Sequence, residues 1–268
     1  MEILPSGIRF RHWRVGEAKA CVLLIHGLAE HTGRYEKLAA RLIAGRIAMV
    51  GPDHVGHGGS PGSRAHLTRF DEYLAPLKAL RIKIGEWYPN KPVFVLGHSM
   101  GGLIAVHLLL DDSSFYQGAL FSAPAFAVAN PVPLPLIWLG RFLRHVAPKM
   151  GMLALDPYQV SRDPAVVNDY IDDPLVYGGK ISAALSIEML NAMEVAIARA
   201  GEIELPVYIG HGDADAMAEP KGSEVFHRAL GSHDKTLEIW PGLYHEIFNE
   251  PESEKVITQY LNWLEEHL

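Results

Sequence analysis

Residues 93–110, VFVLGHSMGGLIAVHLLL, contain the pattern that decides the fold. The segment begins with four apolar residues and ends in an apolar run typical of a buried helix. Between the two runs lies Ser99, with Gly97, Gly101 and Gly102 around it. Glycines leave room where a chain must turn sharply between closely packed elements. The segment therefore predicts a strand, a tight turn with a serine at its tip, and a helix.

Apolar runs of strand length recur along the chain, at residues 7–15, 21–27, 47–53, 118–124, 206–212 and 235–242. Most of them are continuous rather than alternating, which is typical of parallel strands covered on both faces. Segments with helical periodicity lie between them, so we predict an α/β fold with a mostly parallel central sheet and helices on both faces. The run at 7–15 alternates, which suits an edge strand or an initial hairpin.

One interval, residues 125–205, breaks this order because no clear strand is found in it. We predict a single domain whose core comprises residues 1–124 and 206–268, with 125–205 inserted as a helical cap. An insertion after one strand and before the next would lie above the carboxyl edge of the sheet, where ligands bind in such folds.

The cap segment combines apolar and basic residues. No acidic residue occurs between Asp112 and Asp156, whereas Arg141, Arg144 and Lys149 lie among leucines, a tryptophan and a phenylalanine. This composition suits a helix that lies on a lipid–water interface. Packing of the same apolar residues onto the core is an equally good interpretation, and the two are compatible if the helix has two apolar faces.

The composition of the chain disfavours several classes of protein, among them nucleic-acid-binding and membrane-spanning proteins. Apolar residues make up 49% and charged residues 21% of the 268, and the net charge of −7 disfavours a nucleic acid as partner. The single cysteine, Cys21, can form no internal disulfide. The first residues lack the pattern of a signal peptide, and no apolar run reaches the ~20 residues that span a bilayer. We predict a cytoplasmic protein, for which reversible contact with the inner membrane surface is compatible with the sequence.

The serine at the turn fits a catalytic role. Gly97, Ser99 and Gly101 match the G-x-S-x-G nucleophile elbow, in which a strained turn holds the hydroxyl clear of the sheet. A glycine-rich turn that merely carries a serine is the alternative, and the position between strand and helix favours the nucleophile. The backbone N–H groups of Met100 and of Leu28, in the loop after residues 21–27, are the predicted oxyanion donors.

A nucleophilic serine needs a base, and the base needs a carboxylate to orient it. His245 follows the last predicted strand and is the candidate base, although the chain has 14 histidines. Asp213 and Asp215 both follow the preceding strand and compete for the role of acid. We prefer Asp215 because the pattern His-Gly-x-x-Asp puts this carboxylate farther beyond the strand end; Asp213 would then form a turn.

A metal site is the weaker interpretation of another histidine group. Asp53, His54 and His57 lie in the segment DHVGHGGS, which is short and glycine-rich and has no further ligand cluster beside it. Three convergent ligands are hard to present from such a loop. We therefore expect a turn beside the active site, with no metal ion and no organic cofactor.

The motifs HGLAEHTGRY, DHVGHGGSPGS, GHSMGG, DPLVYGGK, HGDADAMAEPKGS and YHEIFNEPE make the chain resemble the monoacylglycerol lipases of the α/β-hydrolase superfamily, above all the bacterial members. The resemblance runs nearly end to end. It implies Ser99 as nucleophile, Asp215 as acid and His245 as base, with a cap over the site. It also implies that Arg34 and Tyr170 lie near the glycerol end of the pocket.

The implied reaction is hydrolysis of a monoacylglycerol, a lipid substrate, to a fatty acid and glycerol through an acyl-enzyme. A lysophospholipase or a general carboxylesterase would use the same three residues, since specificity resides in the pocket. A catalytically silent fold that binds lipid is the third hypothesis. The sequence departs from many relatives at Ala29, where they have glycine, so the loop that carries Leu28 is expected to be less free.

Overall fold

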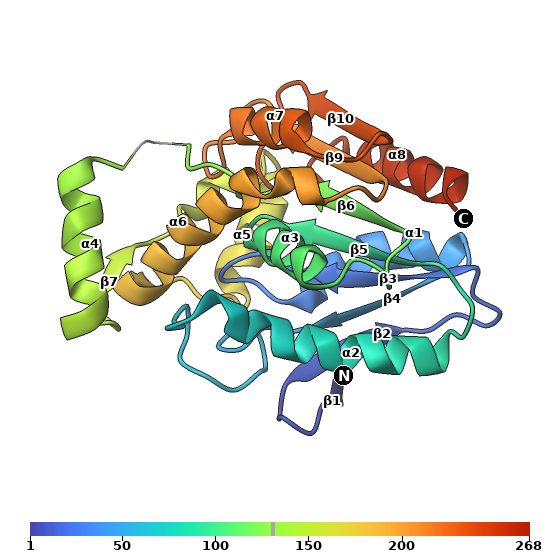
Figure 1. Cartoon of the computed structure of the whole chain (residues 1–268), viewed down its shortest axis with the longest axis horizontal. Helices are drawn as coiled ribbons and strands as arrows, with labels where there is room; N and C mark the ends of the chain where they lie inside the picture. Colours follow the sequence, from blue (N-terminus) through green and yellow to red (C-terminus); the bar gives the residue numbers. More distant parts are fainter. Residues whose placement is uncertain (130–131) are drawn as a thin grey trace.

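The computed structural model describes residues 1–129 and 132–268, and its centre is an eight-stranded sheet (Figure 1). The strands are β1 (Glu2–Ile3), β2 (Arg9–Trp13), β3 (Ala20–Ile25), β4 (Ile47–Pro52), β5 (Val93–His98), β6 (Gly118–Ser122), β9 (Val207–Gly212) and β10 (Lys235–Trp240). Their order is β1-β2-β4-β3-β5-β6-β9-β10. β1 and β2 are antiparallel to their neighbours and all other pairs are parallel, which confirms the predicted mostly parallel sheet. The alternating run at 7–15 forms β2 of the initial hairpin, and β1 is the edge.

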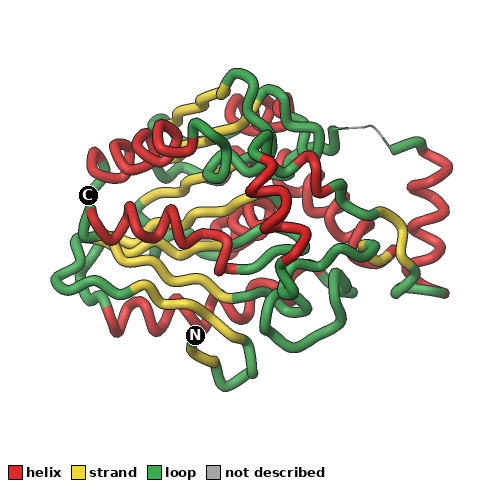
Figure 2. Tube along the Cα trace, turned by 180° about the vertical axis from the view of Figure 1, so that it is seen from behind, coloured by secondary structure: helices red, strands yellow, loops and turns green. Residues whose placement is uncertain are grey.

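Helices cover both faces of this sheet, as Figures 1 and 2 show from opposite sides. On one face α1 (Glu36–Ala44) and α8 (Ser253–Glu266) pack on the sheet around Phe94 and Leu120. The other face carries α2 (Leu74–Trp87), α3 (Met100–Asp111) and α7 (Pro220–Ala229). Strands β3, β4, β5, β6 and β9 are buried throughout, which explains why their sequences are continuously apolar rather than alternating.

The chain between β6 and β9 forms a separate group of elements. These are α4 (Leu134–Val146), β7 (Gly151–Leu153), α5 (Pro164–Asp172), β8 (Ile181–Ser182) and α6 (Ala183–Ala198). β7 and β8 pair as a small antiparallel sheet. Neither strand is visible in the sequence, because strands of two and three residues are too short to produce a periodicity.

Short 3₁₀ helices complete the connections: η1 (Thr32–Tyr35), η2 (Phe70–Tyr73), η3 (Pro157–Gln159) and η4 (Ala200–Glu202). None of the helices within residues 1–129 and 132–268 is long and apolar enough to cross a membrane.

Helix α4 stands at the far end of the molecule, where it lies against α6 (Figure 1). Of its thirteen residues, all described, Gly140 is the buried one. A Cβ atom at Gly140 would lie 2.9 Å from Ile187 Cδ1, so this glycine allows the two helices to approach closely. Large apolar side chains face outward instead, with Trp138 67% and Phe142 62% exposed.

Candidate active site

Ser99 lies between β5 and α3, where its backbone has φ 54° and ψ −122°. A positive φ is strained for any residue with a side chain. The glycines around it are required by contact distances: a Cβ at Gly101 would lie 2.0 Å from Ile25 O, and one at Gly97 would lie 2.5 Å from Gly101 O. The turn therefore cannot form without glycine at these two positions, and it holds the serine hydroxyl away from the sheet.

His245 lies in the loop after β10, and its Nε2 is 2.8 Å from Ser99 Oγ. Its Nδ1 is 2.6 Å from Asp215 Oδ2. An ionised carboxylate only accepts hydrogen bonds, so Nδ1–H donates to Asp215 and the Nε2 lone pair faces the serine hydroxyl. Burial opposes protonation of His245, but the Asp215 carboxylate outweighs burial and raises the pKa of His245. This arrangement can take a proton from Ser99.

The Asp215 carboxylate is held from several sides. Its Oδ1 accepts hydrogen bonds from the backbone N–H groups of Met217 (2.8 Å) and Ala218 (3.0 Å). Burial opposes its ionisation, but attraction to His245 and the hydrogen bonds from His211 and His245 hold the pKa of Asp215 well below its usual range. Asp215 is therefore a fixed negative charge beside the imidazole.

The competing aspartate has a different role. Asp213 Oδ1 accepts a hydrogen bond from Gly242 N at 2.5 Å and so ties the loop after β9 to the loop after β10. The structure brings Asp215 to His245 and gives Asp213 the turn-forming contact.

The two predicted oxyanion donors belong to two different segments of the chain, one of them directly after Ser99. Met100 is the first residue of α3, and the first N–H groups of a helix have no partner within it. Leu28 lines the same cavity as Ser99. The adjacent Gly27 lies so close that a Cβ there would be 3.2 Å from Ser99 Cβ. Both backbone segments are thus near the position that a carbonyl oxygen would occupy.

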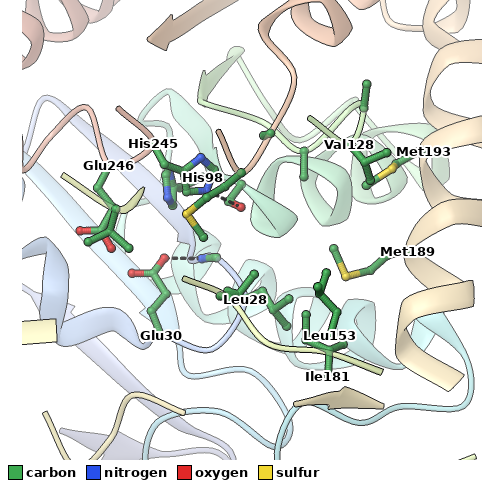
Figure 3. A pocket seen from close by; sticks show the side chains of 18 of the residues that line it. Leu28, Glu30, His98, Val128, Leu153, Ile181, Met189, Met193, His245 and Glu246 are labelled. Carbon is green, nitrogen blue, oxygen red and sulfur yellow. Dashed lines mark hydrogen bonds between the residues drawn. The ribbon is translucent and has the colours of Figure 1, made fainter. Parts of the chain in front are cut away.

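A buried polar group forms one end of the cavity (Figure 3). Arg34 Nη2 donates to Glu246 Oε2 at 2.6 Å, and Arg34 Nε is 3.8 Å from Glu30 Oε2. The guanidinium also lies over the Tyr170 ring, 4.7 Å from its centre. Burial and the Glu246 carboxylate raise the pKa of Glu30. The structure therefore places Arg34 against Tyr170 and beside two glutamates that the sequence did not single out, and a glycerol end at this place stays a prediction.

The members of this group do not all line the cavity. Glu30, Tyr170 and Glu246 line the cavity itself, whereas Arg34 lines a separate surface hollow with Asp169. Arg34 thus acts on the cavity through the side chains that it contacts. Glu30 lies within the motif HGLAEHTGRY, but only the fold reveals that its carboxylate turns back onto the backbone of Gly27.

The other end of the cavity is apolar. Figure 3 shows Met189 and Met193 far from His245, with Leu153 and Ile181 below them. The two methionines are four residues apart on α6 and so share one face of that helix. Leu153 comes from β7 and Ile181 from β8, so the elements inserted between β6 and β9 supply most of this wall. The cavity is therefore polar near the serine and apolar beyond it.

The histidines of the DHVGHGGS segment form hydrogen bonds with backbone carbonyl oxygens. His54 Nε2 donates to His26 O, and His57 Nδ1 donates to Val55 O. Asp53 Oδ1 accepts from Thr32 N and Oγ1. Across residues 1–129 and 132–268, no three histidine, cysteine, aspartate or glutamate side chains are grouped so that they could hold a metal ion. These residues form a packed turn beneath the loop that carries Leu28.

Known proteins are similar to this chain in sequence and in fold. The model of the family Hydrolase_4, described as serine aminopeptidase S33, matches residues 16–252. A monoacylglycerol lipase from Mycolicibacterium smegmatis is 35% identical over 94% of this chain and 90% of its own length. Human monoglyceride lipase is 31% identical over 94% and 84% of the two chains. The crystal structure of the monoacylglycerol lipase of Paleococcus ferrophilus, 32% identical, superposes with a TM-score of 0.88 over 97% of this chain and 99% of that one.

Proposed function

The chain belongs to the Hydrolase_4 family, serine aminopeptidase S33, and from this membership we propose that it is a carboxylic ester hydrolase that splits monoacylglycerols into a fatty acid and glycerol. Its fold is that of the α/β-hydrolases. The observation that carries the proposal is the hydrogen-bonded series Ser99–His245–Asp215 at the boundary between a polar and an apolar half of one cavity.

The first half of the reaction forms an acyl-enzyme. Ser99 Oγ attacks the ester carbonyl while His245 Nε2 takes its proton, and Asp215 stabilises the imidazolium that results. The backbone N–H groups of Leu28 and Met100 donate to the oxyanion of the tetrahedral intermediate. The intermediate collapses, the bond to the glycerol oxygen breaks, and His245 returns the proton to that oxygen.

The second half repeats these steps with water. His245 Nε2 takes a proton from a water molecule, whose oxygen attacks the acyl carbon. Collapse of the second intermediate breaks the bond to Ser99 Oγ, and His245 protonates the serine. The fatty acid leaves and the free enzyme is restored.

The two ends of the cavity support a monoacylglycerol as substrate. The apolar end can bury an acyl chain, which contributes about 0.8 kcal/mol per CH₂ group. The polar end offers the Glu30 and Glu246 carboxylates, which can accept hydrogen bonds from glycerol hydroxyls. The same carboxylates would repel the phosphate of a lysophospholipid, which favours glycerol over a phosphorylated head group.

The family description raises a peptidase as the second candidate. An aminopeptidase must bind a positively charged amino terminus, and two buried carboxylates could in principle serve. Arg34 already lies against both Glu30 and Glu246, so its single positive charge offsets part of their negative charge before any ligand binds. This pairing favours a neutral alcohol at the polar end.

We propose in addition that residues 125–205 form a cap that meets a lipid surface through α4. Leu134, Trp138 and Phe142 are each more than half exposed, and Arg141 and Lys149 accompany them. Apolar side chains beside basic residues suit the boundary between acyl chains and anionic head groups. Substrate in that surface would then enter the cavity beside α6.

Glycerol release from 2-monooleoylglycerol tests the main proposal, with the wild type and Ser99→Ala measured side by side. Dioleoylglycerol, lysophosphatidylcholine and an aminoacyl amide are offered as alternative substrates. We expect rapid release from the monoacylglycerol that is lost in Ser99→Ala. Equal turnover of the lysophospholipid would replace the proposal with a broader lysolipid hydrolase, and preference for the amide would replace it with a peptidase.

A further inference from the structure

Asp215 contacts a second histidine besides His245. His211, at the end of β9, is fully buried, and its Nε2 is 3.1 Å from Asp215 Oδ2. This is the same oxygen that accepts the hydrogen bond from His245 Nδ1. On its other side His211 Nδ1 is 2.7 Å from the hydroxyl of Ser223, which lies in α7. One side chain thus connects the Asp215 carboxylate to a helix on the far side of the loop.

The partners of His211 determine which of its nitrogens carries the proton. Asp215 Oδ2 and the carbonyl oxygen of Ala218, 3.3 Å from Nε2, can only accept, so Nε2 is the donor. In a neutral imidazole Nδ1 is then an acceptor, and the Ser223 hydroxyl donates to it. Every hydrogen bond of this side chain is consistent with a single tautomer.

Of the four hydrogen bonds to Asp215, two come from backbone N–H groups and two come from side chains. Oδ1 binds two backbone N–H groups of its own loop, at Met217 and Ala218. Oδ2 binds only side chains among the described residues, those of His211 and His245. Without His211 the second oxygen would keep His245 alone as a partner, and the carboxylate could rotate about its bond to Cβ.

We propose that His211 is a positioning residue that acts through Asp215. This proposal rests on the function proposed above. Its Nε2–H holds Asp215 Oδ2 where His245 Nδ1 needs it, and Ser223 holds His211 in the tautomer that can do so. A misplaced carboxylate would let the His245 ring turn, and its Nε2 would lose its alignment with the Ser99 hydroxyl.

The proposal has an electrostatic consequence. The Asp215 carboxylate is the main group that raises the pKa of His245, so a carboxylate that has moved away from Nδ1 should let that pKa fall. The other ionisable groups that face His245 stay the same in every variant. They are His98 on β5 with its ring centre 4.8 Å away, Glu246 in the same loop as His245 and Glu30 in the loop after β3.

The test compares His211→Leu, which has no donor, with His211→Gln, whose amide can donate to Asp215. Two rates are measured across the acid and neutral pH range: labelling of Ser99 by a fluorophosphonate, and glycerol release from 2-monooleoylglycerol. We expect His211→Leu to lose about 10- to 100-fold in kcat with little change in KM, because a hydrogen bond to a charged group is lost. Its acid limb should move to lower pH, and His211→Gln should restore both rate and limb. Ser223→Ala should lose less than His211→Leu.

Equal losses in His211→Leu and His211→Gln with an unchanged acid limb would overturn the proposal, because His211 would then serve packing alone. If His211→Leu does not fold, His211→Met provides a second variant of similar volume without a donor. Wild-type protein that is labelled but releases no glycerol would overturn the substrate and leave the test of His211 intact. Wild-type protein that is not labelled at any pH would overturn both.

Discussion

Gly27 N donates a hydrogen bond of 2.5 Å to Glu30 Oε1, and this bond closes the loop that faces Ser99. The same oxygen accepts the hydroxyl of Tyr35 at 2.7 Å. A buried carboxylate thus sits inside the loop and orients the peptide that precedes Leu28. The shape of the proposed oxyanion hole therefore depends on a side chain that touches neither the serine nor the base.

Replacement of Glu30 should accordingly reduce turnover. We expect Glu30→Ala to lower kcat by about 10-fold or more, because a backbone donor and a tyrosine hydroxyl are left without a charged acceptor. Glu30→Gln should lose less, since its amide oxygen can still accept from Gly27 and Tyr35. Steady-state kinetics on a short-chain ester measure both. Equal activity of Glu30→Ala and wild type would show that the loop holds its shape without the carboxylate.

The turn at Ser99 makes a prediction about stability. A Cβ at Gly101 would lie 2.0 Å from Ile25 O, so Gly101→Ala must displace a central strand. We expect this variant to lose about 3 kcal/mol or more in free energy of unfolding, or not to fold, because overpacking here meets backbone rather than a flexible side chain. Gly16→Ala is the matched control, since a Cβ there has no atom within 4 Å. Urea unfolding should find the control within about 0.5 kcal/mol of wild type.

Because His26, His54 and His57 are buried, we expect the protein to lose stability in acid. Burial and mutual repulsion lower the pKa of His54 to about 3 and keep that of His26 well below its usual range. Burial lowers the pKa of His57 to about 4. The unfolded chain takes up protons at these groups near pH 6.5 while the folded protein does not, so the unfolded state binds more protons below that pH. The free energy of unfolding should therefore fall as the pH drops from about 6.5 toward 4, by up to about 1.4 kcal/mol per pH unit for each group.

Two other groups oppose this trend. The pKa values of His245 and Glu30 are raised, so the folded protein takes up protons there and these two groups work against the three histidines. His57→Asn isolates one contribution, because its amide can still donate to Val55 O. Urea unfolding at several pH values should show a shallower dependence for this variant. An identical slope in both proteins would contradict the assignment.

Helix α4 predicts selective loss of activity on lipid surfaces. Trp138 and Phe142 are one turn apart and exposed, and burying each in a bilayer would contribute about 1.5–3 kcal/mol. We expect Trp138→Ser with Phe142→Ser to bind anionic vesicles at least about 10-fold more weakly and to cleave vesicle-bound monoacylglycerol more slowly. Hydrolysis of a water-soluble ester should be unchanged.

Ile82→Ser provides the control for that experiment, because Ile82 is 65% exposed but lies on α2. Vesicle flotation that falls equally in this control would point to general surface hydrophobicity. Flotation that stays at the wild-type level in the double variant would show that α4 does not carry the contact.

The parts of the molecule that could be predicted are those that depend on residues close together in the sequence. The strand, turn and helix around Ser99 follow from spacing alone, and continuous apolar runs indicate buried parallel strands because both faces must be covered. Side chains that act through tertiary contacts could not be predicted in this way. Glu30 turns back onto its own loop, and Asp215 meets His211 because the loop after β9 turns back onto the end of that strand.

The inserted segment illustrates the same limit. Its apolar residues fitted a core-facing helix and a lipid-facing helix equally well, because a hydrophobic pattern does not say what covers it. In the fold α4 packs on α6 with Gly140 at the close approach, and large apolar side chains such as Trp138 and Phe142 stay exposed. The choice between Asp213 and Asp215 likewise depended on the direction of a loop, which two residues of spacing do not determine.

The methionines at the far end of the cavity predict which acyl chains are accepted. Met189 and Met193 lie on one face of α6, and unbranched thioethers adapt to chains of different length. We expect Met193→Trp to fill this end and lower kcat/KM for monooleoylglycerol by about 10-fold or more, since several buried CH₂ groups at about 0.8 kcal/mol each would lose their place. Turnover of a butyryl ester should be unchanged, because a short chain ends nearer to Ser99. A comparison of the two substrates in wild type and variant measures the effect, and parallel losses on both would indicate damage to the catalytic residues rather than a shortened pocket.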